Sequence, residues 1–526
     1  MRKKIVDIVG KVDYPYTCAI VNNQRMGFLD EIETPSSITE LLSVEKGEGR
    51  RTYERTLAFL ISYCAKKIDP SLSISIKHSY GDALYGEIEG NHNGDIVRRV
   101  KEELKKLVEK NEKIVKYELT KEEAMRRLDV EKRTDDLRLL KYVAKDTIPI
   151  YSINGHSVYF AGPLLPRTGM VKVFDVVPYP PGFLLLLPDR KDSKKICHVN
   201  ESKKIFETFQ ESKKWVETLE TRYAGDLNEK IVRRRVSELI KVQEALHGKK
   251  ISNIADMIKD GKRLILIAGP SSSGKTTFAK RLEIQLKVNG LNPFILSTDN
   301  YFVDRDKTPK NEERELNYDS FEAINYKLLQ EQLVALLKGE KVDIPKYNFI
   351  KGKSEPWRRI KINKTGIIIV EGIHALNPRL TQIIDNKEKF SIYVSALTQL
   401  NIDSINRVPT RDTRLIRRIV RDSLFRRVSA SETLRKWPVV IKGEENYIFP
   451  FQENADVMFN SAVVYELAVL KHYAEVALRA IDYKQEEYAE ALRLLNFLSH
   501  FVYITADEIP PTSIMREFIG KSSFKY

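Results

Sequence analysis

The stretch that decides the fold is residues 264–277, LILIAGPSSSGKTT. Its first five residues form an apolar run with the length and branching of a buried strand. The turn that follows matches the pattern G-x-x-x-x-G-K-[ST], and residues 278–287 after it read as a helix. A glycine-rich turn between a strand and a helix directs backbone N–H groups and the positive end of the helix dipole at a phosphate chain. This stretch therefore predicts a phosphate-binding loop in an α/β domain.

Each position of this loop has an expected task. Lys275 supplies a point charge for the β- and γ-phosphates, and Thr276 supplies a hydroxyl for Mg²⁺. A chance Gly/Ser turn is the alternative, but here every fixed position of the pattern matches in the right context. ATP and Mg²⁺ are therefore the expected cofactors. The residues expected to hold the nucleotide are Gly269, Pro270, Ser271, Ser272, Ser273, Gly274, Lys275, Thr276 and Thr277.

Acidic residues follow two further predicted strands. Residues 292–297 read as the second strand, and Asp299 comes just after it. The β-branched run 367–370 reads as a strand that is buried on both faces, and Glu371 stands at its end. In open parallel sheets, ligands bind at the carboxyl ends of the strands. We therefore expect Asp299 to accept a proton from a substrate hydroxyl, or to hold Mg²⁺ through water. Glu371 is expected to serve the metal, and a turn or cap is the alternative for each acid.

An arginine-rich segment lies downstream. Residues 412–422 read DTRLIRRIVRD, in which arginines recur at spacings of three and four, so a helix would carry them on one face. A mobile lid of this kind would supply positive charge to a transferring phosphoryl group and shut out water. A solvated basic face or an RNA-binding stripe is the alternative. The arginines concerned are Arg414, Arg417, Arg418 and Arg421.

Composition is that of an ordinary soluble protein. The chain has 526 residues, of which 42% are hydrophobic and 31% are charged. Its net charge of +15 suits anionic ligands such as nucleotides or RNA, although a basic balance can also serve solubility alone. The cysteines, Cys18, Cys64 and Cys197, form no CxxC pair, and the apolar runs are too short to span a bilayer. We expect a cytoplasmic protein with no membrane segment.

The chain before the loop reads as two modules and a connector. Residues 1–65 alternate short strand-like runs with a helical pattern at 53–65. Residues 66–230 read as mixed α/β, and residues 231–260 form a helical connector without low-complexity sequence. Residues 261–526 hold the loop and the C-terminal helices. We expect the two halves of the chain to touch.

Short signals in residues 66–230 occur in a recognisable order. They are His78-Ser79 after a strand, then Gly162-Pro163, Thr168-Gly169 and Phe174. With them this region resembles the editing-type domain of threonyl-tRNA synthetase, and residues 1–65 resemble the β-grasp (TGS) domain of that enzyme.

The departures from the synthetase pattern matter more than the match. Asp82 stands where the pattern has a second histidine, and Phe160 and Leu164 stand where it has a cysteine and a histidine. Phenylalanine and leucine cannot ligate a metal. We therefore predict a lost metal and editing site, a structural role for His78, and a scaffold kept for binding or assembly.

Residues from about 262 to 480 carry a second set of motifs in a fixed order. These are GPSSSGKTT at 269–277, STDNYF at 297–302, NYDSFEA at 317–323, IPKYNF at 344–349, VEGI at 370–373 and the arginine-rich 412–422. With them this half resembles the uridine kinase/phosphoribulokinase family of P-loop kinases. The whole architecture resembles the long bacterial uridine kinase-like proteins.

The second resemblance implies roles for individual residues. Asp299 would be the general base on a ribose 5′-hydroxyl, and Asp319 would hold the ribose hydroxyls. Tyr301 and Tyr347 would line the nucleoside pocket. The expected catalytic residues are Lys275, Asp299, Arg414 and Arg417, with Arg421 also on the phosphates and with Thr276 and Glu371 on Mg²⁺.

One departure concerns the acceptor. Pyrimidine nucleoside kinases have a base-recognising histidine five positions after the tyrosine matched by Tyr347, and this chain has Gly352 there. Glycine offers no side-chain hydrogen bond, which puts uracil or cytosine selectivity in doubt. Lys351 and Lys353 could equally meet a sugar that is already phosphorylated.

The sequence thus predicts an α/β protein with a C-terminal P-loop kinase, a mostly parallel sheet flanked by helices, and a β-grasp-like module and an α+β synthetase-like domain before it. The expected activity is phosphorylation of a hydroxyl on a small-molecule nucleoside or related sugar. An RNA-associated ATPase or regulator is the alternative from another class, and nucleic acid is not the favoured partner.

The apolar stripe at 491–501 suits core packing or a dimer seam, which makes a homo-oligomer possible. The apolar tail at 510–520 has no role that the pattern explains.

Overall fold

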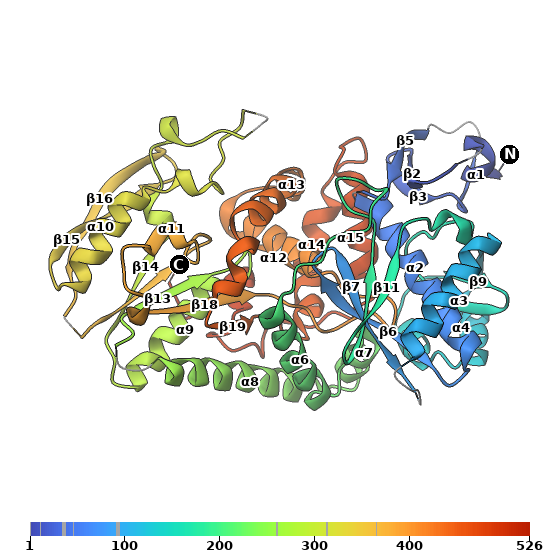
Figure 1. Cartoon of the computed structure of the whole chain (residues 1–526), viewed down its shortest axis with the longest axis horizontal. Helices are drawn as coiled ribbons and strands as arrows, with labels where there is room; N and C mark the ends of the chain where they lie inside the picture. Colours follow the sequence, from blue (N-terminus) through green and yellow to red (C-terminus); the bar gives the residue numbers. More distant parts are fainter. Residues whose placement is uncertain are drawn as a thin grey trace.

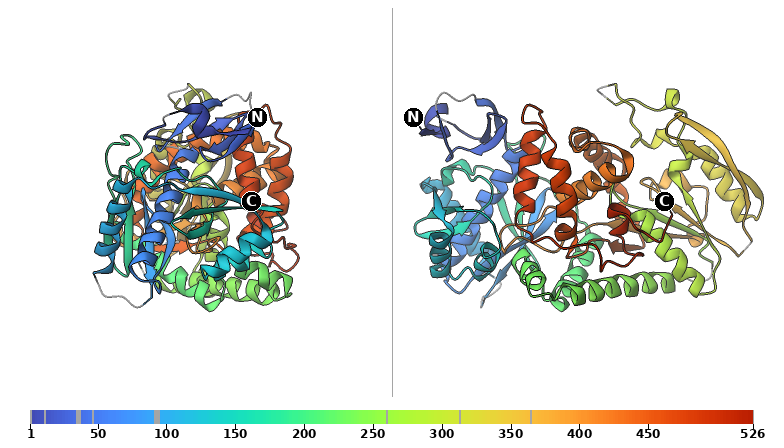
Figure 2. Two further views of the ribbon diagram at one scale, coloured as in Figure 1. Left: turned by 90° about the vertical axis from the view of Figure 1, so that its right-hand side faces the viewer. Right: turned by 180° about the vertical axis from the view of Figure 1, so that it is seen from behind.

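The computed structural model describes residues 2–10, 12–33, 38–45, 47–90, 95–258, 261–311, 314–363 and 365–525. The molecule is elongated, with the N-terminal half at one end and the hairpin of β15 (Lys341–Asn348) and β16 (Lys353–Lys361) at the other (Figure 1). Helix α8 (Val236–Met257) runs along one side and joins the halves, as the view from behind also shows (Figure 2).

The C-terminal half is built on a five-stranded parallel sheet with the order β14-β17-β13-β18-β19. Every residue of β13 and β17 is buried, as expected of apolar strands that are covered on both faces. The parallel sheet predicted from the sequence is therefore confirmed. The strands are β13 (Leu264–Ala268), β14 (Pro293–Ser297), β17 (Ile367–Glu371), β18 (Lys389–Ser395) and β19 (Val457–Asn460).

Helices cover this sheet. Helix α9 (Lys275–Val288) begins at the last residues of the phosphate-binding loop and packs between α8 and the sheet through its buried Phe278, Leu282 and Leu286. The other helices of this half are α10 (Tyr326–Leu337), α11 (Pro378–Thr381), α12 (Thr410–Arg421), α13 (Ala430–Tyr447), α14 (Glu466–Arg479), α15 (Tyr488–Leu498) and α16 (Arg516–Ile519).

The N-terminal half contains antiparallel sheets. Their strand orders are β3-β2-β5, β1-β4, β11-β12-β7-β6 and β10-β9-β8. The strands are β1 (Arg2–Lys4), β2 (Tyr16–Val21), β3 (Gln24–Gly27), β4 (Glu31–Glu33), β5 (Ile38–Ser43), β6 (Ser73–Tyr80), β7 (Ala83–Glu89), β8 (Val115–Thr120), β9 (Thr147–Ile153), β10 (His156–Tyr159), β11 (Asp175–Tyr179) and β12 (Gly182–Leu186). The helices are α1 (Ile5–Val9), α2 (Gly47–Ile68), α3 (Ile96–Lys110), α4 (Lys121–Val130), α5 (Thr134–Leu140), α6 (Lys203–Thr218) and α7 (Ala224–Val232).

Local signals explain several of these elements. The helical pattern at 53–65 is the middle of α2, whose Leu57, Leu60, Ile61 and Cys64 are fully buried. A capping box formed by Thr120 and Glu123 begins α4. The helical pattern at 53–65 is therefore confirmed, while the β-grasp and synthetase-like assignments remain predictions.

One apolar cluster joins the halves. It runs from Ala124 and Leu128 of α4, through α7 and α8, to α9, α12, α14 and α15. The expected contact between the halves is therefore confirmed. Among the described helices, none has both the length and the apolar character that crossing a bilayer requires.

Candidate active site

The phosphate-binding loop joins β13 to α9, and its glycines are required by their surroundings. A Cβ atom on Gly269 would overlap the carbonyl oxygen of Val394 in the neighbouring strand β18. Gly274 has φ +82°, and a Cβ atom there would lie 2.6 Å from Cγ2 of Ile514. The hydroxyls of Ser272 and Ser273 are buried and have no hydrogen-bond partner within the described residues. The loop therefore presents polar groups that remain available to a ligand.

Lys275 folds back over this loop. Its Nζ atom donates a hydrogen bond to the carbonyl oxygen of Pro270 at 3.0 Å. Burial lowers the pKa of Lys275, while the carboxylates of Glu371 and Asp299 oppose this shift. The predicted lysine and the two predicted acids are thus close enough to act on one another's charge.

The two acids meet at one edge of the sheet because β14 and β17 pair in parallel with Ser297 opposite Glu371. Burial, and secondarily the charge of Asp299, raise the pKa of Glu371 to about 7. Solvent reaches Asp299, yet the protein around it raises the pKa of its carboxyl as well, against the charges of Lys275, Arg426 and Arg421. One lysine does not neutralise both carboxylates, so a divalent cation fits this position electrostatically.

Asp319 lies near enough to Asp299 and Lys275 for their charges to act on its carboxyl. Burial raises its pKa to about 6, with Arg418 opposing and with Glu444 and Asp299 adding to the shift. Helix α13 approaches closely, because a Cβ atom on Gly443 would lie 2.7 Å from that of Asp319. The structure therefore brings Asp319 into the electrostatic surroundings of Asp299 and Lys275.

The two predicted tyrosines take different places. Tyr301 is buried in the core with its hydroxyl donated to Gln332 at 2.7 Å, so it packs the segment in place and does not face the site. This differs from the predicted pocket-lining role, because the Tyr301 ring is 1% exposed and belongs to an apolar cluster of the kinase half. Tyr347 instead belongs to an aromatic cluster with Phe302, Tyr318 and Phe349.

Arg305 occupies the space beside Gly352. A Cβ atom on Gly352, whose φ is +68°, would lie 2.6 Å from Nε of Arg305. The Arg305 guanidinium also donates to the carbonyl oxygen of Phe349 at 2.7 Å, and its charge opposes the raised pKa of Tyr347. A cation therefore stands where the sequence comparison expected a histidine. Arg305 is distant from Gly352 in the sequence, so no local pattern could have indicated it.

The four arginines of α12 that were expected on one face divide into two pairs. Arg414 and Arg417 are 1% and 0% exposed and form buried ion pairs with Glu444 and Glu466. They also donate to the loop carbonyl oxygens of Ser271 at 3.2 Å and Ser272 at 3.3 Å.

The expectation of a mobile lid is therefore wrong for Arg414 and Arg417 in this structure, because both lie beneath the loop and hold its backbone. Arg418 donates to the Ser271 hydroxyl at 2.9 Å, and the charge of Arg421 acts on Lys275 and Asp299. Arg418, Arg421 and Arg426 are the arginines that face the acids.

Sequence reasoning missed three carboxylates at the loop. Glu444 accepts the backbone N–H of Ser271 at 3.0 Å, and Glu466 pairs with Arg417. Glu517 accepts both the backbone N–H and the hydroxyl of Thr277. Glu444 is 173 residues from Ser271 and Glu517 is 240 residues from Thr277, and no spacing rule connects acids so distant in the sequence to the loop.

Of the positions at which the synthetase pattern has metal ligands, His78, Phe160 and Leu164 are buried in the core. His78 is stacked on Phe209 with ring centroids 3.6 Å apart, and burial lowers its pKa to about 3. Phe160 and Leu164 are fully buried. Asp82 instead pairs with Arg190. Three other carboxylates, those of Asp135, Asp136 and Asp403, gather around the guanidinium of Arg133, which already supplies a cation there.

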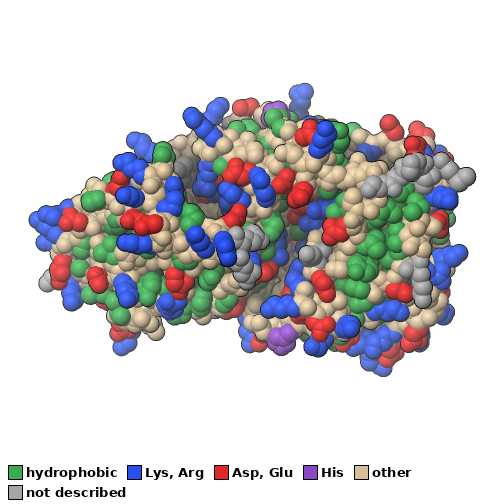
Figure 3. Space-filling view, turned by 90° about the horizontal axis from the view of Figure 1, so that it is seen from above, with side chains coloured by type: hydrophobic (Ala, Val, Ile, Leu, Met, Phe, Trp, Pro, Cys, Tyr) green, Lys and Arg blue, Asp and Glu red, His purple; other side chains and the backbone are tan. Residues whose placement is uncertain are grey.

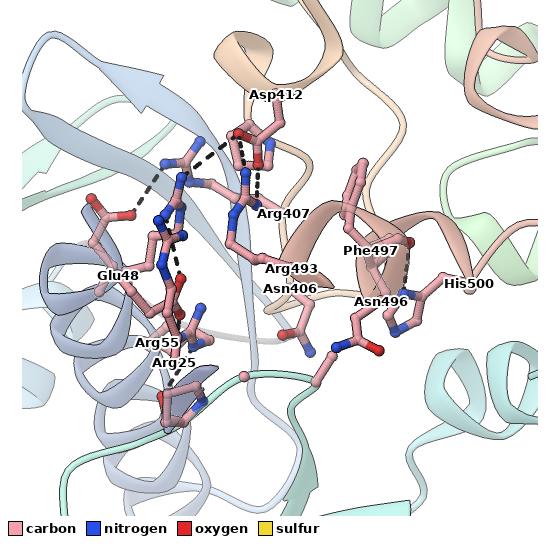
Figure 4. A pocket seen from close by; sticks show the side chains of 18 of the residues that line it. Arg25, Glu48, Arg55, Asn406, Arg407, Asp412, Arg493, Asn496, Phe497 and His500 are labelled. Carbon is pink, nitrogen blue, oxygen red and sulfur yellow. Dashed lines mark hydrogen bonds and ion pairs between the residues drawn. The ribbon is translucent and has the colours of Figure 1, made fainter. Parts of the chain in front are cut away.

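A cavity of about 230 Å³ lies between the halves, away from the loop (Figure 4). Its charged wall is a network in which Arg55 pairs with Glu48 of α2, and Arg493 of α15 binds Asp412 in the first turn of α12 at 2.7 and 2.9 Å. On the face seen from above, basic and acidic side chains are interspersed over the surface (Figure 3). On that face, the net positive charge is not gathered into one stripe.

Comparison with known proteins matches the C-terminal half. The model of the phosphoribulokinase/uridine kinase family matches residues 264–468. A uridine kinase of Ureaplasma urealyticum is 30% identical over 196 residues, which are 37% of this chain and 86% of that protein. A uridine kinase of Staphylococcus haemolyticus is 32% identical over 197 residues, which are 37% of this chain and 86% of that protein. A solved structure described as a possible uridine kinase from Bacillus stearothermophilus aligns with 40% of this chain and 98% of its own, at 20% identity and a TM-score of 0.27.

The family model begins at the first residue of β13 and extends into α14, so it covers the loop, the strand-end acids and α12. The N-terminal half lies outside the matched residues. Through its C-terminal half, this chain belongs to the phosphoribulokinase/uridine kinase family of kinases.

Proposed function

We propose that this chain transfers the γ-phosphoryl group of ATP to a hydroxyl of a nucleoside or of a related sugar, with Mg²⁺ as the metal. The observation that carries the proposal is the meeting of Lys275, Asp299 and Glu371 at the carboxyl edge of the parallel sheet, beside a loop in which the hydroxyls of Ser272 and Ser273 are unpartnered within the described residues. Phosphoryl transfer to a hydroxyl needs a proton acceptor, a cation on the phosphates and a metal ligand at one place, and Asp299, Lys275 and Glu371 supply these three.

The chemical step needs one base and several cations. Asp299 accepts the proton of the acceptor hydroxyl as its oxygen attacks the γ-phosphorus, and the bond from that phosphorus to the β-phosphate oxygen breaks to release ADP. Lys275, turning from Pro270, and Arg421 stabilise charge on the phosphate oxygens. Thr276 and Glu371 would hold Mg²⁺, which when bound neutralises charge on the β- and γ-phosphates.

The acceptor side suggests a flat or polyhydroxylated molecule. Asp319 can accept hydrogen bonds from sugar hydroxyls, and the cluster around Tyr347 offers aromatic faces to a base. Phe349 keeps 58% of its surface exposed, so part of this cluster is open to solvent. Arg305 beside it can donate to a base carbonyl or pair with a phosphate on a sugar.

A substrate screen tests the proposal. Nucleosides and phosphorylated sugars are incubated with ATP and Mg²⁺, and both ADP release and the mass of the product are measured. An acceptor gaining one phosphoryl group, with equimolar ADP, is the expected result. ADP release without any phosphorylated acceptor across the screen would contradict the proposal. Arg305→Ala, assayed on the same panel, is expected to change the ranking of acceptors while ATP binding is kept.

A further inference from the structure

The C-terminal segment of the chain ends on the phosphate-binding loop. In both ribbon views the C-terminus lies beside the parallel sheet of the kinase half (Figures 1 and 2). Ile514, Met515 and Phe518 are fully buried in the core that includes α9 and α12. Ile514 lies directly against the loop, since it is the residue that a side chain on Gly274 would strike. The tail is therefore an integral part of the site's surroundings.

Glu517 of α16 binds the first turn of helix α9. Its Oε2 atom accepts the backbone N–H of Thr277 at 3.2 Å and the Thr277 hydroxyl at 2.7 Å. Thr277 stands two residues after Lys275, where backbone N–H groups have no partner inside the helix. Such N–H groups at a helix N-terminus, after a glycine-rich turn, are donors for phosphate oxygens. A carboxylate oxygen therefore holds donors that a bound phosphate chain would use.

The charge of Glu517 acts on the rest of the site. Its carboxylate is among the groups that raise the pKa of Lys275 and the pKa of Glu371. A polyphosphate on the loop would meet this carboxylate as a like charge as well as a rival for Thr277. Binding a nucleotide therefore favours movement of the Glu517 side chain.

The carboxylates at the loop differ in how they are neutralised. Glu444 also accepts a loop N–H, but Arg414 pairs with it and both are buried. Glu517 has no ion pair with a lysine or arginine within the described parts of the chain. Releasing Glu517 breaks two hydrogen bonds and strands no buried cation. A bound phosphate could therefore displace Glu517 from its N–H donor, whereas Glu444 is held in place by Arg414.

The tail backbone is anchored independently of Glu517. Ser513 donates to Glu244 of α8 at 2.5 Å, and Arg516 donates to the carbonyl oxygens of Ala506 at 2.8 Å and Ile509 at 2.6 Å. The guanidinium of Arg417 lies 5.0 Å from the ring of Phe518. The Glu517 side chain can therefore leave Thr277 while the tail remains attached.

We propose that Glu517 is an internal competitor of the nucleotide: its carboxylate occupies the Thr277 donors in the resting protein and is displaced when a nucleoside triphosphate binds. The proposal rests on the proposed function, since it requires a nucleoside triphosphate on this loop. It assigns the C-terminal tail an autoinhibitory role in the kinase half.

Equilibrium binding of ATP with Mg²⁺ to the full chain tests this. Glu517→Gln removes the charge and keeps the shape, and we expect it to bind ATP about tenfold more tightly than the unaltered protein. Glu508→Gln, which removes an exposed charge from the same tail, is the matched control and should leave the affinity unchanged. Equal affinity of Glu517→Gln and the unaltered protein, or weaker binding by the variant, would refute the competitor.

A second measurement uses the unaltered protein, so it does not depend on how a variant folds. In a crystal structure of the unaltered protein with Mg²⁺ and a non-hydrolysable ATP analogue, the Glu517 carboxylate should have left Thr277, and a phosphate oxygen should accept the Thr277 N–H in its place. A phosphate chain on the loop with Glu517 still hydrogen-bonded to Thr277 would refute the proposal. If neither the unaltered protein nor Glu517→Gln binds ATP, the proposed function fails and this inference fails with it.

Discussion

At the scale of single residues, the site gathers three carboxyl groups whose surroundings disfavour their charged forms. Asp299, Glu371 and Asp319 share one region with Lys275, and the pKa of each acid is raised. Raised values mean that the charged forms are held at a cost in stability when no cation is bound. Function and stability therefore place opposite demands on these carboxylates.

The variant Glu371→Gln tests whether the negative charge of Glu371 lowers the stability of the folded protein, because the effect of removing that charge should depend on pH. The pKa of Glu371 rises from 4.5 to about 7 on folding, so the native state loses stability as pH increases through that window. At pH 8 and without nucleotide, we expect the variant to have a free energy of unfolding higher than that of the unaltered protein by on the order of 2–3 kcal/mol. Denaturant titrations at pH 8 and pH 5 measure it, and the difference should shrink towards zero at pH 5. A difference that is the same at both pH values would exclude charge as its cause.

Asp299→Asn tests the base. The amide cannot accept the acceptor's proton, so we expect kcat with the acceptor found by the substrate screen to fall by about 10²–10⁴-fold. ATP affinity should stay within a few-fold of the unaltered value, because Lys275 and the loop backbone are intact. Asp306→Asn, at an exposed acid in the same connection, is the control and should keep full turnover. Full turnover by Asp299→Asn would remove Asp299 from the mechanism.

At the scale of elements, α12 acts as a brace beneath the phosphate-binding loop. Its two buried arginines join loop carbonyl oxygens to Glu444 of α13 and Glu466 of α14. Buried pairs contribute little against an apolar replacement of both partners, but removing one partner leaves a stranded charge. The brace therefore makes the loop's shape dependent on helices that lie far along the chain.

Arg414→Met should expose that dependence. Glu444 would remain buried without its cation, so we expect the free energy of unfolding to fall by about 3–5 kcal/mol, together with weaker ATP binding. Arg411→Met removes the partly exposed pair of the same helix with Glu445 of α13, and should cost no more than about 1 kcal/mol. Denaturant titration measures the free energy of unfolding of both variants. If both variants lose the same amount of stability, burial does not distinguish the two ion pairs.

The sequence predicted elements better than it predicted their surroundings. The run 264–268 and the run 367–370 became strands because β-branched apolar residues exclude other structures there, and the loop pattern located α9. The spacing of the arginines correctly predicted one helix. It could not reveal that Glu444 and Glu466 cover Arg414 and Arg417, since burial depends on helices folded later in the chain. Arg305 and Glu517 were missed because each is distant in the sequence from the residue that it contacts.

At the scale of the whole molecule, the two halves are joined by charge as well as by the apolar core. Arg493 of α15 is bound to Asp412 of α12 and to Glu490, while Arg51 of α2 approaches the same acids at 3.8 and 3.6 Å. Asp412 stands in the first turn of the helix that braces the loop. The N-terminal half therefore contacts α12, the helix that holds the phosphate-binding loop.

Arg493→Met tests this connection. Without Arg493, Asp412 and Glu490 repel each other beside the start of α2, so we expect faster hydrogen exchange in the first turns of both α2 and α12. Arg479→Met, at an exposed arginine ending α14, is the control and should change neither segment. Faster exchange confined to α15 would show that the network is local to that helix.

Helix α8 contacts both the C-terminal tail and the first helix after the phosphate-binding loop. At 22 residues it is about 33 Å long, and its Glu244 accepts from Ser513 of the tail and from Tyr465 while pairing with Arg281 of α9. A tilt of α8 would therefore shift Glu244 and, through its hydrogen bond to Ser513, the segment that places Glu517 against Thr277.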